Sequence, residues 1–202
     1  MIVEMRQWNQ GRNGRAHGRI ALALAALLFI RPDAGFPQAA PAASAAARDG
    51  QHDFDWEIGN WSTHLRYLPE PLTGSNRWVE YRGTSDVRAV MGGRANLVVL
   101  TVVGQAGRIE GASLRLYNPQ ARQWTLNFAS MRNGQLTQPV TGGFDGHGRG
   151  TFYGLDTVDG RSVLVRFVIS DVTPNSARFE QSFSNDGGAT WEPNWIAVDT
   201  RR

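Results

Sequence analysis

The 202-residue sequence contains no cysteine and no lysine, so all 21 of its basic residues are arginines. The absence of cysteine excludes a disulfide-stabilised scaffold, a cysteine-based zinc site, a thiol nucleophile and an N-terminal lipidated cysteine. The sequence also lacks a phosphate-binding loop, a dinucleotide-binding fingerprint and the G-x-S-x-G motif of many hydrolases. No cofactor is therefore predicted from motifs.

Net charge is absent from most of the chain. Residues 1–47 carry five arginines against two acidic residues, whereas residues 48–202 carry 16 arginines against 16 acidic residues. The isoelectric point of about 9.9 thus reflects the N-terminal part alone. A neutral domain lacks the positive surface that phosphate contacts require, so nucleic acid is not expected as a partner.

Residues 1–47 have the features of a cleaved signal peptide followed by an alanine-rich leader. A polar segment with several arginines precedes the apolar run at 20–30, and the stretch at 38–47 contains A-x-A cleavage sites. Eleven apolar residues at about 1.5 Å each are too short for a membrane core of roughly 30 Å. We therefore expect a periplasmic or secreted protein whose single domain spans residues 48–202.

The predicted fold is all-β. After residue 62, short runs of β-branched and aromatic residues alternate with turn residues every eight to twelve positions. The pattern predicts a short helical turn before the first strand and ten strands, at 61–68, 77–90, 95–103, 108–117, 123–130, 138–144, 149–156, 162–170, 176–184 and 193–200. Hairpin-sized connections favour an antiparallel up-and-down β-barrel, because closure removes the edge strands. A two-sheet sandwich is the alternative.

Alternation within the strands predicts an inner face rich in aromatic rings, with a few polar groups among them. The aromatic members are Trp61, Tyr67, Tyr81, Trp124, Phe128, Phe167, Phe179 and Phe183, and the polar members are Thr63, Ser85, Asn127 and Gln181. The register of the strand at 108–117 stays open: either Arg115 and Tyr117 face inward, or Leu114 and its alternate neighbours do. No histidine, aspartate or glutamate is predicted to face inward.

The hairpin that follows the strand at 162–170 is predicted to be symmetric about Thr173. Phe167 then faces Phe179 inside the barrel, and Arg166 faces Glu180 outside it. An exposed cross-strand ion pair of this kind contributes less than about 1 kcal/mol, so no catalytic role is expected for it.

Gly59-x-Trp61, within the sequence F-D-W-E-I-G-N-W at 54–61, resembles the G-x-W signature of the lipocalin, or calycin, superfamily. The resemblance implies that Trp61 closes one barrel end beneath an arginine of the last strand. Arg201 and Arg202 occupy the corresponding positions, and stacking of guanidinium on indole is favourable.

The wider pattern is similar to a family of secreted bacterial proteins of unknown function, related to lipocalins and to nitrobindin-type barrels. It comprises S-L-R-L-Y-N-P at 113–119, G-F at 143–144, F-Y-G at 152–154 and the segment 184–191. The resemblance covers roughly residues 52–200 and implies a closed barrel of about ten strands around an apolar cavity. Nitrobindin-type proteins bind haem through a histidine near the C-terminus. The last histidine here is His147, in a predicted turn, so haem binding is not expected.

Residues 184–191 match S-x-D-x-G-x-T-W, the Asp-box of sialidases and related propellers. In such a turn Asp186 accepts backbone N–H bonds and Trp191 folds back over the loop. One copy, in a chain too short for a propeller, predicts a stiffened hairpin rather than glycosidase chemistry.

His52, Asp53 and Asp55 offer three metal-ligating side chains, but metal sites usually collect ligands from separated segments. No metal site is therefore predicted. His64 alternates onto the outer face, where a solvated side chain is expected.

Apolar walls with sparse polar groups are typical of a ligand pocket, and a small barrel leaves room for one small molecule. We therefore expect a small hydrophobic or aromatic ligand, bound by Tyr67, Tyr81, Arg115, Trp124, Phe128, Phe167, Phe179 and Gln181. A core filled by these rings is the structural alternative.

The functional alternative is a small cofactor-independent enzyme, a lyase, isomerase or hydrolase, with its active site inside the barrel. The lack of a predicted inward proton carrier favours binding over catalysis. The strand at 95–103 is apolar on both faces, which suggests a covering partner such as a second subunit of a homodimer.

Overall fold

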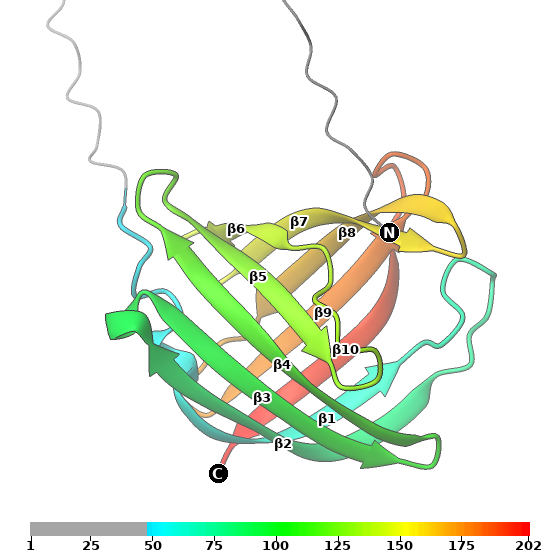
Figure 1. The fold of residues 1–202 in the computed structure, drawn as a ribbon, viewed down its shortest axis with the longest axis horizontal. Coiled ribbons are helices and arrows are strands. Elements are labelled where there is room, and N and C mark those ends of the chain that lie inside the picture. The colour runs from blue at the N-terminus through cyan, green and yellow to red at the C-terminus, as the bar shows by residue number, and fades with distance from the viewer. Residues whose placement is uncertain (1–47) are drawn as a thin grey trace, which may run out of the picture. The chain divides into compact units, whose positions relative to one another are not determined.

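The computed structural model describes residues 48–202, which form a ten-stranded antiparallel β-barrel (Figure 1). Consecutive strands pair with each other, and the first strand also pairs with the last, so the barrel is closed and has up-and-down topology. The all-β barrel prediction is confirmed, and the sandwich is excluded. The predicted signal peptide and leader, residues 1–47, lie outside the described residues.

The observed strands agree with the predicted ranges to within two residues at each end. They are β1 (Gly59–Tyr67), β2 (Val79–Val90), β3 (Ala95–Gly104), β4 (Gly107–Asn118), β5 (Gln123–Ser130), β6 (Val140–Phe144), β7 (Gly150–Val158), β8 (Arg161–Ser170), β9 (Ser176–Ser184) and β10 (Glu192–Arg201). Two short 3₁₀ helices, η1 (Asp55–Glu57) and η2 (Met91–Gly93), accompany them. No helix within residues 48–202 has the length and apolar character needed to cross a membrane.

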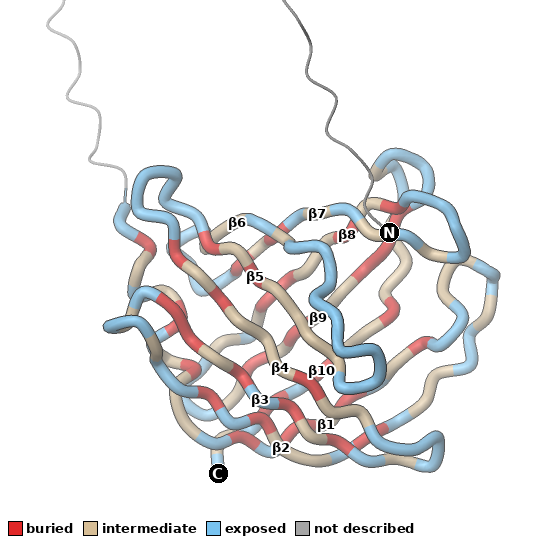
Figure 2. Tube along the Cα trace, viewed as in Figure 1, coloured by how far each residue is buried: buried red, intermediate tan, exposed pale blue. Residues whose placement is uncertain are grey.

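Buried and more accessible positions alternate along most strands, as the colours of Figure 2 show. The alternation follows from strand geometry, because successive side chains point to opposite faces. In β4, Arg115 and Tyr117 are buried, whereas Leu114 is only partly buried. Of the two registers that the sequence leaves open, the one with Arg115 inside the barrel is therefore correct.

Residues 50–58, hereafter the plug segment, close one end of the barrel. The ring of Phe54 is buried and meets those of Trp124 and Phe144 at centroid distances of 4.8 and 5.1 Å. The indole N–H of Trp124 also donates to the carbonyl of Gly50 at 2.8 Å. The stretch that precedes the first strand is thus part of the core.

Trp61 and Arg201 join the first strand to the last at this plugged end. Trp61 is fully buried, and its indole N–H donates to the carbonyl of Glu57 at 2.7 Å. The guanidinium of Arg201 lies 4.1 Å from the Trp61 ring centroid. A Cβ at Gly59, where φ is 131°, would lie 2.7 Å from Arg201 Nη1, so glycine leaves room for the guanidinium. This is the arrangement that the lipocalin resemblance implies.

The predicted register between β8 and β9 is wrong by two residues. Phe167 lies opposite Gln181, and Phe179 lies opposite Ile169, so the hairpin is centred on residue 174. The Thr173 side chain shifts the centre, because its hydroxyl accepts the N–H of Ser176 at 2.9 Å and so fixes the start of the turn.

The predicted ion pair between Arg166 and Glu180 is absent as a result. Arg166 lies opposite Ser182 and stacks over the ring of Trp191, with its guanidinium carbon 4.5 Å from the centroid. Glu180 instead accepts from Arg178 of its own strand at 2.6 Å.

The segment 184–191 folds as a tightly hydrogen-bonded turn between β9 and β10. The Asp186 carboxylate accepts the Thr190 N–H at 3.0 Å and the Thr190 hydroxyl at 2.6 Å, and Ser184 donates to it at 2.7 Å. These bonds to the charged form hold the pKa of Asp186 well below its usual value. Gly187 has a φ of 74°, which only glycine adopts without strain.

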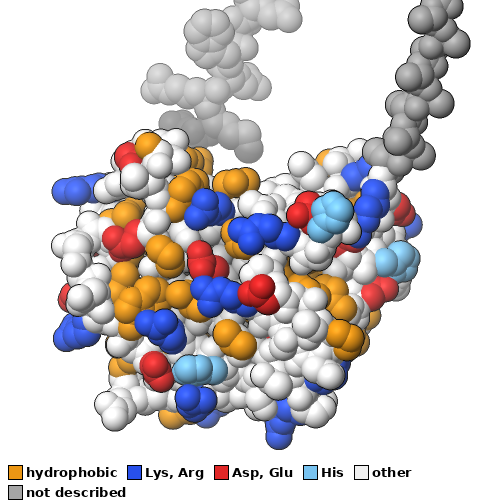
Figure 3. Space-filling view, turned by 180° about the vertical axis from the view of Figure 1, so that it is seen from behind, with side chains coloured by type: hydrophobic (Ala, Val, Ile, Leu, Met, Phe, Trp, Pro, Cys, Tyr) orange, Lys and Arg blue, Asp and Glu red, His pale blue; other side chains and the backbone are white. Residues whose placement is uncertain are grey.

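The outer surface of the barrel carries mixed charge. Figure 3 shows arginine, acidic and apolar side chains interspersed on the side opposite to the view of Figure 1. On β3, Val99 and Val103 are 39% and 55% exposed, so the described chain leaves this outer strand face partly open. A second subunit covering it stays a prediction.

Candidate functional site

The barrel contains a cavity of about 290 Å³ rather than a completely filled core. Its apolar wall includes Leu100, Leu126, Phe128, Val165, Phe167, Phe179 and Trp195. The volume is close to the lower end of the roughly 300–1,000 Å³ found for small-molecule pockets. The interior is thus large enough for a compact ligand.

Five of the eight predicted ligand-binding residues lie on the surface of this cavity. They are Arg115, Phe128, Phe167, Phe179 and Gln181, and the predicted polar residues Thr63, Ser85 and Asn127 join them. The predicted positions match the cavity lining because side chains alternate between the inner and outer faces along each strand, and the closed sheet keeps this alternation.

The other three predicted residues, Tyr67, Tyr81 and Trp124, lie in the surrounding core. Trp124 packs on the plug segment, as described above. Tyr81 is buried, and Tyr67 packs edge-on against Trp195 at a centroid distance of 5.9 Å. The structure therefore places these rings behind or beside the cavity wall, where they support it.

An ion pair lies buried at the plugged end of the cavity. Glu57, from η1, and Arg115, from β4, pair through Oε2 and Nη1, and the two residues are 1% and 5% exposed. The Arg115 guanidinium also lies over the ring of Phe54, 4.6 Å from its centroid. Burial lowers the pKa of Arg115 to about 9, against the effect of the Asp199 charge, so Arg115 stays protonated at neutral pH.

A second buried carboxyl, that of Asp199 on β10, faces the same space. Asp199 lies directly opposite Thr63 on β1, and the Thr63 hydroxyl is 2.7 Å from that of Ser85 on β2. Burial raises the pKa of Asp199 to about 6, while the neighbouring Thr63 and Ser85 hydroxyls and the charge of Arg115 oppose the rise. Asp199 is therefore mostly ionised at neutral pH but close to its titration range.

Several buried polar atoms at this end have no hydrogen-bond partner within residues 48–202. Glu57 Oε2 and Arg115 Nη1 face each other in the ion pair, and Trp56 Nε1 lies in the plug segment. Two more belong to side chains of the cavity lining and have neither a hydrogen bond nor an ion pair. They are Oδ1 of Asp199 and Nε of Arg115. Buried polar atoms are usually satisfied, so unpaired ones beside a cavity indicate where an incoming polar group would bind.

The prediction that no acidic side chain faces inward is wrong. Glu57, Asp156 and Asp199 all line the cavity. The signal for Asp199 was present, since it follows Trp195 and Ala197 at alternate positions of one strand. Glu57 gave no such signal, because a 3₁₀ turn does not follow the period of two.

The cavity lining carries no net positive charge. Its charged side chains are the three carboxyls and the single guanidinium of Arg115. The interior therefore does not attract anions by charge, in contrast to a pocket built around several arginines.

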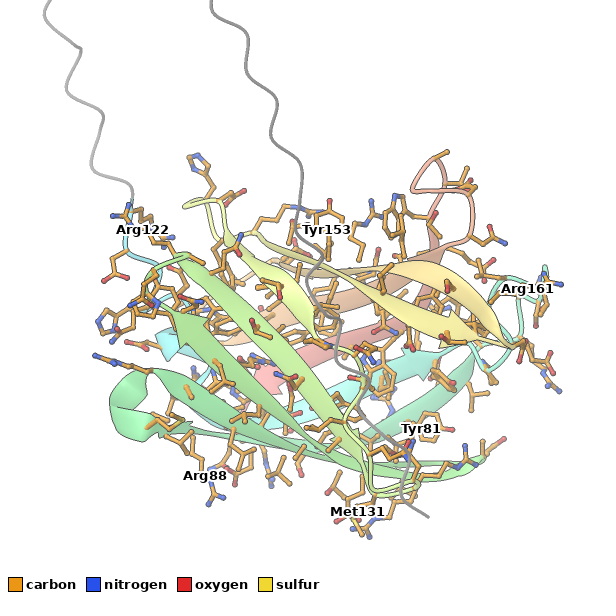
Figure 4. The ribbon with its side chains drawn as sticks, turned by 45° about the horizontal axis from the view of Figure 1, so that its top comes forward. Tyr81, Arg88, Arg122, Met131, Tyr153 and Arg161 are labelled. Atoms are coloured by element: carbon orange, nitrogen blue, oxygen red, sulfur yellow. The ribbon has the colours of Figure 1, made fainter. Side chains whose placement is uncertain are left out.

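The wall of the cavity is weakest between β5 and β7. β6 pairs with β5 over only three residue pairs, and Thr137 and Gln138 of the connection between β5 and β6 contribute to the lining. Figure 4 shows Met131, at the start of this connection, pointing away from the barrel, and Met131 is 71% exposed. A non-strand segment thus forms part of the cavity wall far from the plug segment.

The cluster of His52, Asp53 and Asp55 makes polar contacts outside the cavity. Asp53 pairs with Arg48, and His52 Nδ1 lies 2.8 Å from Asp55. In the part of the chain that the structure describes, no three metal-ligating side chains are placed so that they could hold a metal ion together. His64 lies on the outer face, 3.2 Å from Glu80.

Comparison with known proteins identifies the fold. The S-type phycobiliprotein lyase CPES from Guillardia theta aligns with a TM-score of 0.54 and 11% identity, over 77% of this chain and 94% of the lyase. The shared feature is the barrel. No protein-family model and no curated protein matches the sequence.

Two further solved barrels align less well. EF1p2_mFAP2b bound to DFHBI gives a TM-score of 0.43 and 8% identity, over 76% of this chain and 99% of its own. A de novo designed fluorescence-activating β-barrel gives a TM-score of 0.40 and 12% identity, over 77% of this chain and 99% of its own. Identities this low transfer neither a ligand nor an activity to this chain.

Proposed function

We propose that this chain is an exported, lipocalin-like barrel that binds a small hydrophobic or aromatic molecule in its interior. The observation that carries the proposal is the cavity of about 290 Å³, walled by the rings of Phe128, Phe167, Phe179 and Trp195. Aromatic walls with few polar groups favour a flat apolar ligand, because burial of its surface drives binding.

Export is supported by the sequence of residues 1–47, with its arginine-bearing start, short apolar run and A-x-A sites. The resemblance to secreted barrels agrees with it. N-terminal sequencing of the protein recovered from the periplasm or medium of a bacterial host tests this part of the proposal. A new N-terminus near residue 48 is expected, and recovery of the intact chain from the cytosol alone would contradict export.

Binding inside the barrel is tested with N-phenyl-1-naphthylamine, a neutral aromatic probe whose fluorescence rises in apolar surroundings. Ser113 of β4 lines the cavity next to Phe128, with which it is paired on the adjacent strand β5. Its chain neighbour Ala112 points outward. Ser113→Phe fills the cavity and is expected to weaken probe binding at least tenfold. Ala112→Phe adds the same ring outside and should leave the affinity unchanged.

Circular dichroism verifies that both variants fold. Equal affinity in the two variants would place the probe on the outer surface and contradict the proposal. Native mass spectrometry of the freshly purified protein complements the titration, because a co-purifying molecule would identify the natural ligand directly.

Asp199 favours a second candidate, acid–base catalysis on a bound carbonyl compound. Its carboxyl has a pKa of about 6 and lines the cavity together with Arg115. An ionised Asp199 would take a proton from the carbon next to the carbonyl. The C–H electron pair would form the C=C bond of an enolate while the C=O π pair moves onto the oxygen, where the guanidinium would stabilise it. Return of the proton to carbon would then restore the carbonyl.

Hydrogen–deuterium exchange into 1-tetralone, an aromatic ketone, tests this candidate. Mass spectrometry in D₂O should show faster deuterium uptake at the carbon next to the carbonyl with the wild-type protein than with Asp199→Asn or buffer. Equal uptake in the three samples would exclude general-base catalysis by Asp199 on this substrate class.

A further inference from the structure

We infer that the plugged end of the cavity binds a neutral group that both donates and accepts hydrogen bonds, such as a carboxamide or a phenol. The aromatic body of the ligand then lies away from the plug segment, against Phe128 and Trp195. This inference rests on the proposed function and specifies the class of ligand.

The first argument is the pair of unsatisfied atoms. Oδ1 of Asp199 needs a donor, and Nε of Arg115 needs an acceptor; neither finds one among the described residues. Both residues are at least 95% buried and both line the same cavity, so one bound group can reach them there. A carboxamide supplies an N–H for the carboxylate and a carbonyl oxygen for the guanidinium.

The second argument is charge. Glu57 already pairs with Arg115, and Asp199 adds a second carboxylate at neutral pH. A bound carboxylate would therefore meet two like charges and would offer no donor to Asp199. A bound ammonium would satisfy Asp199 but would leave Nε of Arg115 without an acceptor. Only a neutral donor–acceptor group satisfies both atoms.

The third argument is the order of side chains along β10. Trp195, Ala197 and Asp199 face the cavity at alternate positions, and only Asp199 is next to the strand end where Arg201 contacts the plug segment. Phe128 and Trp195 meet at a centroid distance of 6.4 Å farther from that end. The polar and aromatic parts of the cavity thus follow one another along the barrel, which fixes the orientation of the ligand.

Four naphthalenes substituted at the same position test the inference: 2-naphthamide, 2-naphthoate, 2-naphthylmethylamine and 2-methylnaphthalene. They share one aromatic body and differ in the group that would reach Asp199. Isothermal titration calorimetry of the wild-type protein at pH 7.5 is expected to show 2-naphthamide binding at least tenfold more tightly than each of the other three.

The same titrations with Asp199→Leu identify the contact. Removal of the acceptor should reduce the advantage of 2-naphthamide over 2-methylnaphthalene to less than threefold. Thr200→Leu, on the outer face of the same strand, is the matched control and should keep the full advantage.

The possible outcomes separate the two proposals. If 2-methylnaphthalene, the naphthoate or the amine binds as tightly as the amide, the inference is wrong, although the cavity still binds aromatic molecules. If none of the four binds, the proposed function and the inference fall together. A preference for the amide that survives in Asp199→Leu would also overturn the inference.

Discussion

Among single residues, Asp199 makes the stability of the barrel depend on pH. Its pKa rises from 3.8 to about 6 on folding, mainly through burial, so the folded state holds the proton more tightly than the unfolded chain. The contribution of this group is therefore most favourable below pH about 4 and is lost as the pH rises through about 6. A shift of this size corresponds to a loss on the order of 3 kcal/mol.

Asp199→Asn should remove this dependence, because the amide keeps the shape of the side chain without a charge to bury. Urea denaturation between pH 4 and pH 8 is expected to show similar stability for the two proteins at the acidic end. At pH 8 the variant should be more stable by about 1–3 kcal/mol. Parallel pH profiles for the wild type and the variant would contradict the assignment of the raised pKa to Asp199.

The pair formed by Glu57 and Arg115 is expected to behave as one unit. Glu57→Gln leaves the buried guanidinium without its counter-charge and should lower the free energy of unfolding by about 3–5 kcal/mol. The double variant Glu57→Gln with Arg115→Met should recover most of that loss, since no buried charge remains. Denaturant unfolding of Glu57→Gln, of Arg115→Met alone and of the double variant provides the test, and additive effects would show that the two side chains act independently.

At the scale of elements, two adjacent glycines in β6 provide a matched pair. A Cβ at Gly142 would lie 2.0 Å from the carbonyl oxygen of Thr151 on β7, whereas a Cβ at Gly143 would meet no atom within 4 Å. Gly142→Ala should therefore destabilise the protein by about 1–3 kcal/mol, because β6 must move away from β7. Gly143→Ala should be nearly silent in thermal unfolding, and an equal loss in both variants would argue against close strand contact as the cause.

The positions of the strands were predictable from the sequence, because turn residues and the alternation of side chains are local signals. Turn residues and a period of two located all ten strands, because a closed antiparallel sheet keeps the same alternation throughout. The register between β8 and β9 was not predictable in this way, since the hydroxyl of Thr173 sets the turn through its own hydrogen bonds. Such a side-chain contact leaves no periodic signal.

The candidate site was predictable only in part. Phe128, Phe167, Phe179 and Gln181 follow from strand alternation. Trp195 and Asp199 were not predicted, although alternation along β10 could have located both. Glu57 could not be located in this way, because it enters from the plug segment, whose position depends on packing of Phe54 against rings far away in the sequence. Local patterns do not contain that tertiary contact.

For the barrel as a whole, Arg201 is the residue that secures closure. Its guanidinium stacks on Trp61 and donates to the carbonyls of Trp56, Ile58 and Pro174 at 2.5, 3.1 and 2.8 Å. Arg201→Met should lower the free energy of unfolding by about 2–4 kcal/mol, since charge-assisted hydrogen bonds and a stacked cation are lost together.

Arg202→Met is the control for this change, because the neighbouring side chain is exposed and only its backbone N–H, which donates to Asn60 at 3.0 Å, joins the first strand. Chemical denaturation followed by tryptophan fluorescence measures both variants. A similar loss of stability in the two variants would mean that the removal of one positive charge, rather than the loss of the Arg201 contacts at Trp61, lowers the stability.

The pairing of β1 with β10 has a consequence for biosynthesis. β1 is made before all the other strands, yet it finds its second neighbour only when β10 has been made. A nascent chain therefore exposes an unpaired strand on each side throughout translation, a state prone to association with other chains. The addition of β10, rather than of any earlier strand, converts this open ribbon into a barrel without edges.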